Sequence, residues 1–268
     1  MIQDEFRNGV IEGTFKLWDI LRKENIKGFL IGGSAIGAAR EQGMIPWDDD
    51  ADYAIKRKDL EKLETIIERY IDNQYYLVVP KKEPDYYLSI YKFLNKSSNL
   101  DKYVEKGTKL HGAFVDIFPL DKTPKFIPLR RMQQLLVRID RVSIDMKLGR
   151  MNTGKKLGYF RYIAKLKSRL LTGKRIQKSM IRKCKLFNWL PVGYCYYNFS
   201  TPYGIDQEIY FKEEIKDLVK LPFEGEQLPV AVGYDAILRR TYGDYMQLPS
   251  EDKRIAAHIV KEKEKDYI

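Results

Sequence analysis

The sequence Phe29-Leu30-Ile31-Gly32-Gly33-Ser34 is followed, after a short helical stretch, by Pro46-Trp47-Asp48-Asp49-Asp50-Ala51-Asp52-Tyr53. In the first segment an apolar run precedes two glycines, which predicts a buried strand, a glycine turn and a helix over 34–42. The first N–H groups of a helix that follows such a turn bind phosphate readily. We therefore expect the backbone amides of Gly33 and Ser34, with the Ser34 hydroxyl, to orient a phosphate group.

The second segment places four aspartates within five consecutive positions. Carboxylates packed so closely repel one another, and a divalent cation is the usual way in which a protein neutralises them. If a strand begins at Ala51, its two-residue repeat puts Asp50 and Asp52 on one face, and Asp48 reaches the same face. The alternative is a solvated acidic loop, which the apolar strands around the cluster disfavour.

A later apolar run contains a single carboxylate, Asp116, between Val115 and Ile117. Burying an isolated carboxylate is costly, so the group needs a partner, and a metal ion is the obvious one. We expect Asp116 to be a third metal ligand. The alternatives are a buried salt bridge and a strand-end residue that points to solvent.

The remaining hydrophobic patterns predict helices and strands in alternation. Helices are expected over 2–24, 58–71 and 234–241, and strands over 27–31, 51–55, 75–79, 86–94 and 112–121, with a short hairpin or loop over 221–230. This order indicates an α/β (α+β) fold with a mixed sheet and flanking helices. We divide the chain into a catalytic core (1–121), a basic helical insert (122–190) and a C-terminal segment that completes the active site (191–268).

The composition is that of a globular protein without a membrane span. The chain has 268 residues, of which 44% are hydrophobic and 32% charged, and no apolar stretch approaches the ~18 residues that cross a bilayer. The N-terminus lacks a basic region followed by an apolar one, so no export is expected. Cys184 and Cys195 offer neither a disulfide framework nor zinc-ligand spacing. We predict a cytoplasmic protein, with peripheral contact to the inner face of the plasma membrane as an option.

The positive charge is concentrated in one segment. Between Lys122 and Lys185 the sequence has 20 Lys or Arg against Asp140 and Asp145, a balance of +18, which leaves −7 for the rest because the formal net charge is +11. Apolar residues recur at helical spacing over 127–148 and again over 157–170. Two interpretations are equally weighted: basic helices that lie on an anionic membrane surface or polymer, and a solvated insert that packs on the sheet.

Together the motifs resemble those of the LicD family of phosphotransferases, a branch of the nucleotidyltransferase fold whose eukaryotic relatives include fukutin and fukutin-related protein. The matching segments run in family order along most of the chain: Gly32-Gly33-Ser34, Gly37-Ala38-Ala39-Arg40, Gly43 to Asp52, His111 to Asp121, Pro222-Phe223-Glu224-Gly225 and Tyr242-Gly243-Asp244-Tyr245. The family commonly has Ile or Val where Ala51 stands. The resemblance implies a nucleotidyltransferase-like mixed sheet core, with Asp116 matching the third carboxylate of that fold.

The resemblance also implies transfer of a phosphorylated alcohol from a CDP-linked donor to a sugar hydroxyl, with release of CMP. Asp50, Asp52 and Asp116 would hold one or two Mg²⁺ ions, with Mn²⁺ as a substitute. Either Asp48 or Asp116 would accept the proton of the acceptor hydroxyl. Phosphocholine from CDP-choline is the favoured group, and a lipid-linked cell-surface glycan such as a teichoic acid precursor is the expected acceptor. The alternative is ribitol or glycerol phosphate from a CDP-polyol.

Residues expected to bind substrates come from several segments. They are Gly33, Ser34, Arg40, Trp47, Lys92, His111, Glu224 and Tyr242. Arg40 would stabilise the transferring group, with an ordinary helix-surface arginine as the equal alternative, and Lys92, Glu224 and Tyr242 are the weaker candidates. A choline ammonium would need aromatic walls, for which Trp47, Tyr86 and Tyr196 are candidates.

Two rival functions use parts of the same pattern. A nucleotidyltransferase would use the same aspartates but retain the nucleotide on its product, and its basic segment would bind nucleic acid. A non-catalytic module for anionic polymers would need only the basic helices, so the complete set of carboxylates disfavours it. We expect no nucleic acid partner.

Overall fold

The fold is described from a computed structural model of the chain, for residues 4–97, 99–105, 108–151, 159–254 and 259–261. The chain divides into two compact units. The first comprises Met1–Val79, Ile90–Pro119 and Glu213–Ile268, and the second comprises Pro80–Ser89 and Leu120–Lys212. The domain boundaries predicted at 121 and 190 stay predictions. No helix among the described residues combines the length and the apolar character needed to cross a bilayer.

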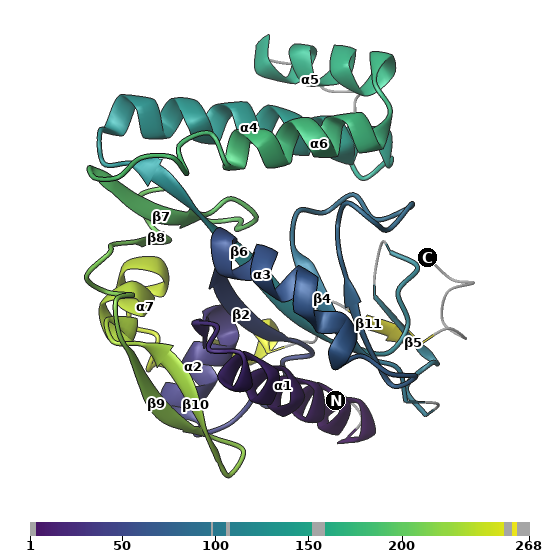
Figure 1. The fold of residues 1–268 in the computed structure, drawn as a ribbon, viewed down its shortest axis with the longest axis vertical. Helices are drawn as coiled ribbons and strands as arrows, with labels where there is room; N and C mark the ends of the chain where they lie inside the picture. The colour runs from purple at the N-terminus through teal and green to yellow at the C-terminus, as the bar shows by residue number, and fades with distance from the viewer. Residues whose placement is uncertain (1–3, 98, 106–107, 152–158, 255–258, 262–268) are drawn as a thin grey trace. The chain divides into compact units, whose positions relative to one another are not determined.

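The first unit combines helices with most of a mixed sheet (Figure 1). Its helices are α1 Asp4–Lys23, α2 Gly32–Arg40, α3 Arg57–Ile66 and α7 Tyr234–Tyr242, with short 3-10 helices at Ile67–Arg69 and Glu251–Lys253. Its strands are β1 Gly28–Leu30, β2 Ala51–Lys56, β3 Tyr75–Val78, β4 Tyr91–Asn95, β5 Tyr103–Glu105, β9 Leu218–Phe223, β10 Glu226–Ala231 and β11 Ile259–Lys261. Strand β6, Ala113–Pro124, begins in this unit.

The strands of the large sheet follow the order β3-β4-β6-β2-β1-β10-β9. Strand β1 pairs in parallel with β10 and antiparallel with β2, so the sheet is mixed and the predicted fold class is confirmed. Strands β5 and β11 form a separate two-stranded sheet. Because β6 and β2 are neighbours, the order places the strand that carries Asp116 beside the strand that carries Asp52.

Helix α1 covers the sheet with one apolar face. Its buried residues include Phe6, Val10, Leu17, Ile20 and Leu21, which recur at helical spacing and pack against β4 and β2. Burial of this stripe removes apolar surface from water and fixes the helix on the sheet. The helix predicted from the same spacing is confirmed over the described residues.

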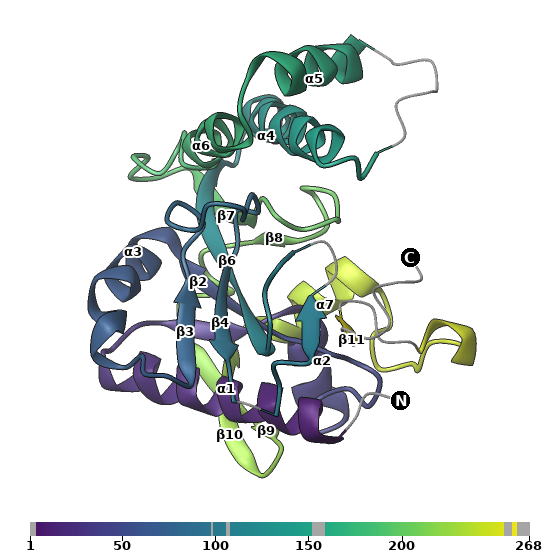
Figure 2. The same cartoon turned by 90° about the vertical axis from the view of Figure 1, so that its right-hand side faces the viewer.

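The second unit is a layer of helices above two short strands (Figure 2). Its elements are α4 Ile127–Lys147, α5 Tyr159–Leu170, α6 Gly173–Cys184, β7 Tyr194–Asn198 and β8 Ile209–Tyr210. Strand β7 pairs with the last residues of β6 and with β8, which brings the sheet to nine strands. Its core includes Val137 and Ile144 of α4, Ile176 and Met180 of α6, and Tyr197 of β7.

Three sequence predictions need correction. The helix expected from Ser34 begins at Gly32, whose φ of +57° only glycine adopts easily, so the two glycines form its first turn. The strand expected from Tyr86 begins at Tyr91, because the carbonyls of Tyr86 and Leu88 accept hydrogen bonds from Gln177. Helix α6 was not predicted as a separate element, although the Thr172 side chain caps it by accepting from the Arg175 N–H.

Candidate active site

Three carboxylates from two neighbouring strands lie together in the first unit. Each of Asp50, Asp52 and Asp116 offers an oxygen within 4.8 Å of the other two. Asp50 stands immediately before β2, Asp52 is its second residue, and Asp116 belongs to β6. Asp50 and Asp116 are buried, with exposed fractions of 7% and 6%. The structure therefore brings together the three residues that the sequence predicted as metal ligands.

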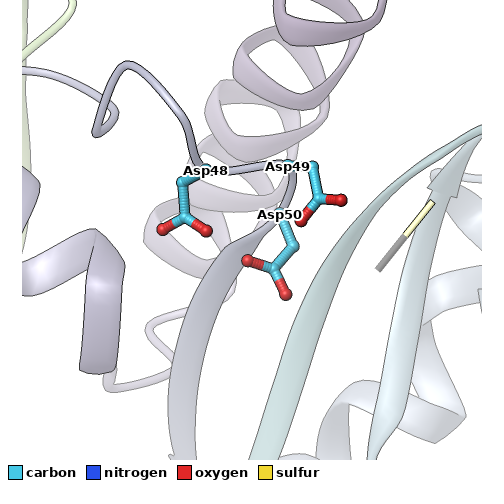
Figure 3. Close-up of side chains that lie close together, drawn as sticks. All are labelled: Asp48, Asp49 and Asp50. Carbon is cyan, nitrogen blue, oxygen red and sulfur yellow. The ribbon is translucent and has the colours of Figure 1, made fainter. Parts of the chain in front are cut away.

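A second group of carboxylates precedes β2. Asp48, Asp49 and Asp50 also offer oxygens within 4.8 Å of one another, and Figure 3 shows them side by side. Asp49 is completely buried, and its Oδ2 accepts a hydrogen bond from the Ile259 N–H at 3.0 Å. Asp50 belongs to both groups and connects them into one cluster of five aspartates, which we call the acidic centre: Asp48, Asp49, Asp50, Asp52 and Asp116.

The glycines of α2 allow the aspartates to approach the helix N-terminus. A Cβ atom at Gly32 would lie 2.7 Å from Asp52 Oδ2, and one at Gly33 would lie 2.5 Å from Asp48 Oδ2. The Ser34 hydroxyl accepts a hydrogen bond from the Asp52 N–H at 2.8 Å, which ties α2 to the start of β2. The first N–H groups of α2 have no partner within the helix. They lie close to the carboxylates of Asp48 and Asp52, because those side chains approach the helix at Gly33 and Gly32.

Replacing Gly32 by Ala tests this close approach. A left-handed φ costs a residue with a Cβ about 1–2 kcal/mol, and the new methyl group would also displace the Asp52 carboxylate. Gly225→Ala is the matched control, because Gly225 has a φ of +84° and an added Cβ would meet no atom within 4 Å. We expect urea denaturation to show similar destabilisation for both variants. Only Gly32→Ala is expected to lose the catalytic activity of this site, by about tenfold or more, and equal losses would contradict the proposed role of the contact.

Asp116 is held by a buried ion-pair network. Lys92 of β4 lies opposite Asp116 in the strand register, and its Nζ contacts Asp116 Oδ1 and, at 2.9 Å, Glu105 Oε1. The Lys92 side chain is completely buried, and its Nζ lies 4.1 Å from the Phe114 ring centroid. Burial lowers the pKa of Lys92, but the two carboxylates outweigh burial and raise it, so the ammonium group stays charged.

Glu105 is the member of this network that the sequence did not reveal. Burial raises the pKa of the Glu105 carboxyl above its ordinary value, while the Lys92 ammonium group opposes the shift. Asp116 therefore forms a buried salt bridge, which was one alternative considered from the sequence. It also lies beside Asp50 and Asp52, as expected of a third metal ligand. The predicted contact of Lys92 with substrate stays a prediction; in the structure its Nζ contacts Asp116 and Glu105.

Glu224 and Tyr242 approach the acidic centre from the C-terminal part of the first unit. Glu224 Oε1 accepts from Arg7 Nη2 at 2.6 Å and from the Met44 N–H at 2.9 Å. These bonds fix the loop that leads to the aspartates, so Glu224 supports the site through the backbone. The Tyr242 hydroxyl lies 3.6 Å from the position of a Cβ at Gly32. Arg7 was not found from sequence, because nothing in a helix-surface arginine points to a partner 217 positions away.

Arg40 does not lie beside the carboxylates. It is the last residue of α2, about 12 Å along the helix axis from Gly32. Its Nε donates to Glu41 Oε1 at 2.7 Å and its Nη1 donates to the Tyr245 carbonyl at 2.8 Å. The placement therefore favours the alternative of a structural arginine over a contact with the transferred group.

The aromatic residues and the histidine that were expected to contact substrate lie at separate positions in the structure. Trp47 is half-buried, and the Arg254 guanidinium carbon lies 5.4 Å from its ring centroid. His111 Nδ1 is 2.8 Å from the Asp101 carbonyl oxygen, and no contact described for the ring reaches the carboxylates. Tyr86 and Tyr196 are buried in the second unit.

The fold and the site define a nucleotidyltransferase-type protein: a mixed sheet carries an Asp-x-Asp pair and a third aspartate on the neighbouring strand, beside a glycine-rich helix start. Residues 25–127 match the family described as LicD/FKTN/FKRP, nucleotidyltransferase domain. The matched residues 25–127 therefore resemble a nucleotidyltransferase domain of the LicD type.

Two curated proteins have sequences similar to that of this chain. The chain is 28% identical over 243 residues to the lipopolysaccharide cholinephosphotransferase LicD of Haemophilus influenzae, a match that covers 85% of each chain. It is 29% identical over 109 residues to an uncharacterized protein of Rickettsia prowazekii, which covers 40% of this chain and 37% of that one.

Proposed function

We propose that the chain is a phosphotransferase that moves phosphocholine from CDP-choline to a sugar hydroxyl of a cell-surface glycan precursor, such as that of a teichoic acid, and releases CMP. The observation that carries the proposal is the meeting of Asp50, Asp52 and Asp116 within 4.8 Å, close to the start of α2. The choice of phosphocholine rests on the similarity to a cholinephosphotransferase over most of the chain.

The donor set suits a hard divalent cation. Mg²⁺ and Mn²⁺ prefer oxygen ligands, and every candidate ligand here is a carboxylate. Asp50, Asp52 and Asp116 would hold one or two such ions. When bound, the metal supplies Lewis-acid stabilisation of the charge on the diphosphate. The N–H groups of Gly33 and Ser34 would orient a donor phosphate at the helix start.

The contacts favour Asp48 over Asp116 as the base that accepts the acceptor proton. Asp116 is buried and ion-paired with Lys92, and in this proposal it is already a metal ligand. Asp48 is half-buried and stands beside Gly33, near the expected phosphate position. In this proposal Asp48 takes the proton and Asp116 binds metal.

The choline ammonium would lie on the Trp47 ring. A cation already occupies a ring face there, since the Arg254 guanidinium carbon is 5.4 Å from the centroid, and a quaternary ammonium is held by the same attraction. Trp47 immediately precedes Asp48, so the two ends of phosphocholine would be bound by adjacent residues. We propose a lipid-linked acceptor. We also propose a cytoplasmic reaction, which the two free cysteines support because free thiols suit a reducing compartment.

The proposal is tested by measuring CMP release from CDP-choline, CDP-ribitol and CDP-glycerol in the presence of Mg²⁺, with and without extracts of lipid-linked glycans. We expect release from CDP-choline alone, lost in Asp52→Asn. Release from a CDP-polyol would replace phosphocholine by a polyol phosphate. A product that retains the nucleotide would instead indicate a nucleotidyltransferase, and no turnover of any donor would overturn the proposal.

A further inference from the structure

Helix α5 of the second unit exposes its apolar side chains. The exposed fractions are 74% for Tyr159, 61% for Tyr162, 49% for Leu166 and 71% for Leu170. The one residue that α5 buries is Ala164. An amphipathic helix of a globular protein normally turns its apolar stripe toward the core, so α5 has the opposite orientation and its apolar stripe lacks a covering element among the described residues.

The exposed side chains form one continuous stripe. Its members are the exposed Tyr159, Tyr162, Leu166 and Leu170 and the half-buried Ile163, which together span about a third of the helix circumference at 3.6 residues per turn. Ala164 is nearly opposite, and α5 packs against α4. Both views place α5 on the side of α4 and α6 that is remote from β7 and β8 (Figures 1 and 2). The stripe therefore points away from the rest of the second unit.

Basic side chains border the stripe. Arg161, Lys165 and Arg169 recur at every fourth position and form a row along one edge. On the other edge, Lys167 pairs with Asp140 of α4, and Asp140 also accepts from Lys183 Nζ of α6 at 2.7 Å. Asp140 is completely buried, so these ion pairs fix the rotation of α5 that exposes the stripe.

A hollow on the side of α5 that faces α4 also combines apolar and basic groups. It has a volume of about 340 Å³ and lies between α4 and α5, lined by Leu135, Ile139, Val142 and Phe160, with Arg138 and Arg161 also in its wall. An acyl chain fits the aliphatic part of such a hollow, and the guanidinium groups fit a lipid phosphate.

We propose that α5 lies on the surface of an anionic lipid bilayer, with its stripe at the boundary between headgroups and acyl chains and its basic residues at the lipid phosphates. Interfacial helices bind by this combination of apolar area and cationic flanks, and tyrosine is typical of that depth. The charge of +18 between Lys122 and Lys185 disfavours a second copy of the chain as the covering partner, because two such segments repel. Nucleic acid would not cover an apolar stripe.

The test is co-sedimentation of the full chain with vesicles, which needs no catalytic turnover and so stands apart from the proposed function. We expect binding to vesicles of phosphatidylcholine with phosphatidylglycerol, little binding to phosphatidylcholine alone, and release at high salt. In the double variant Leu166→Ser with Leu170→Ser, the partition coefficient is expected to fall about tenfold or more. The matched control Val219→Ser with Leu248→Ser changes exposed apolar residues of the first unit and is expected to bind normally.

A second pair of variants separates charge from apolar contact. Lys165→Gln with Arg169→Gln is expected to weaken binding to anionic vesicles about tenfold or more, whereas Lys58→Gln with Lys220→Gln, in the first unit, leaves binding unchanged. Absence of binding to anionic vesicles, or equal losses in test and control variants, would overturn the proposal. It would also be overturned by a concentration-dependent dimer that the Leu166→Ser with Leu170→Ser variant abolishes, since a second copy would then cover the stripe.

Discussion

Replacing Asp50 by Asn is expected to lower the proposed release of CMP from CDP-choline by about 10²–10³-fold or more. Asp50 belongs to both carboxylate groups, so replacing its carboxylate by an amide lowers the negative charge of both groups at once. The substitution is nearly isosteric, and it relieves repulsion among neighbouring carboxylates. The protein should therefore fold, and the loss of activity should belong to the site.

The measurement pairs turnover with metal binding. Titration with Mn²⁺, followed by its paramagnetic signal, is expected to show weaker binding in Asp50→Asn than in the native chain. Asp217→Asn is the control, because that side chain is 66% exposed and lies outside both groups. Chelation by EDTA is expected to stop turnover of the native chain, and added Mg²⁺ or Mn²⁺ to restore it. Native turnover by Asp50→Asn, or turnover that survives EDTA, would remove the metal from the mechanism.

Replacing Lys92 by Met is expected to lower the free energy of unfolding by about 3–5 kcal/mol. Methionine keeps the length of the side chain and much of its packing, but it leaves the buried carboxylates of Asp116 and Glu105 without their shared cation. An ion pair of this kind adds little compared with an apolar replacement of all its members, whereas removal of one partner is costly. Urea denaturation measures the difference.

Two further variants separate the loss of the buried cation from other effects of replacing a lysine. Lys58→Met, at an exposed position of α3, is expected to change the free energy of unfolding by less than about 0.5 kcal/mol. The double variant Lys92→Met with Glu105→Gln is expected to recover part of the loss, because the second change removes one of the two carboxylate charges that had contacted the Lys92 ammonium group. If Lys92→Met is as stable as the native chain, the network does not hold Asp116 in the way that the contacts indicate. If Lys92→Met does not fold, Glu105→Gln alone still tests the network, with a smaller loss expected.

The network also bears on how the acidic centre is maintained. Asp50, Asp52 and Asp116 repel one another, and Lys92 is a fixed cation that offsets part of this repulsion from behind Asp116. Its contact is with Oδ1 of Asp116. A carboxylate has several lone pairs, so a hydrogen-bonded oxygen does not prevent the group from binding a metal ion as well. The ion pair and the proposed metal ligand are thus compatible functions of one residue.

The sequence alone determined the local parts of this protein. Strand alternation indicated that Asp50 and Asp52 share a face, the glycines indicated a helix start beside them, and an isolated carboxylate in an apolar strand singled out Asp116. These inferences hold because a backbone repeat of two or 3.6 residues is a property of the local chain. The same reasoning yielded the mixed sheet, since the order of elements restricts how strands can pair.

Only the tertiary structure decided which distant residues meet. Glu105 joined Lys92 and Asp116 through strand packing, Arg7 met Glu224 across 217 positions, and Arg40 was bonded to the Tyr245 carbonyl at the far end of α2. The apolar spacing of α5 predicted a helix but not its rotation, which the Asp140 ion pairs set. A repeat fixes which residues share a face, whereas the partner of that face depends on packing between elements, for which a single sequence carries no local signal.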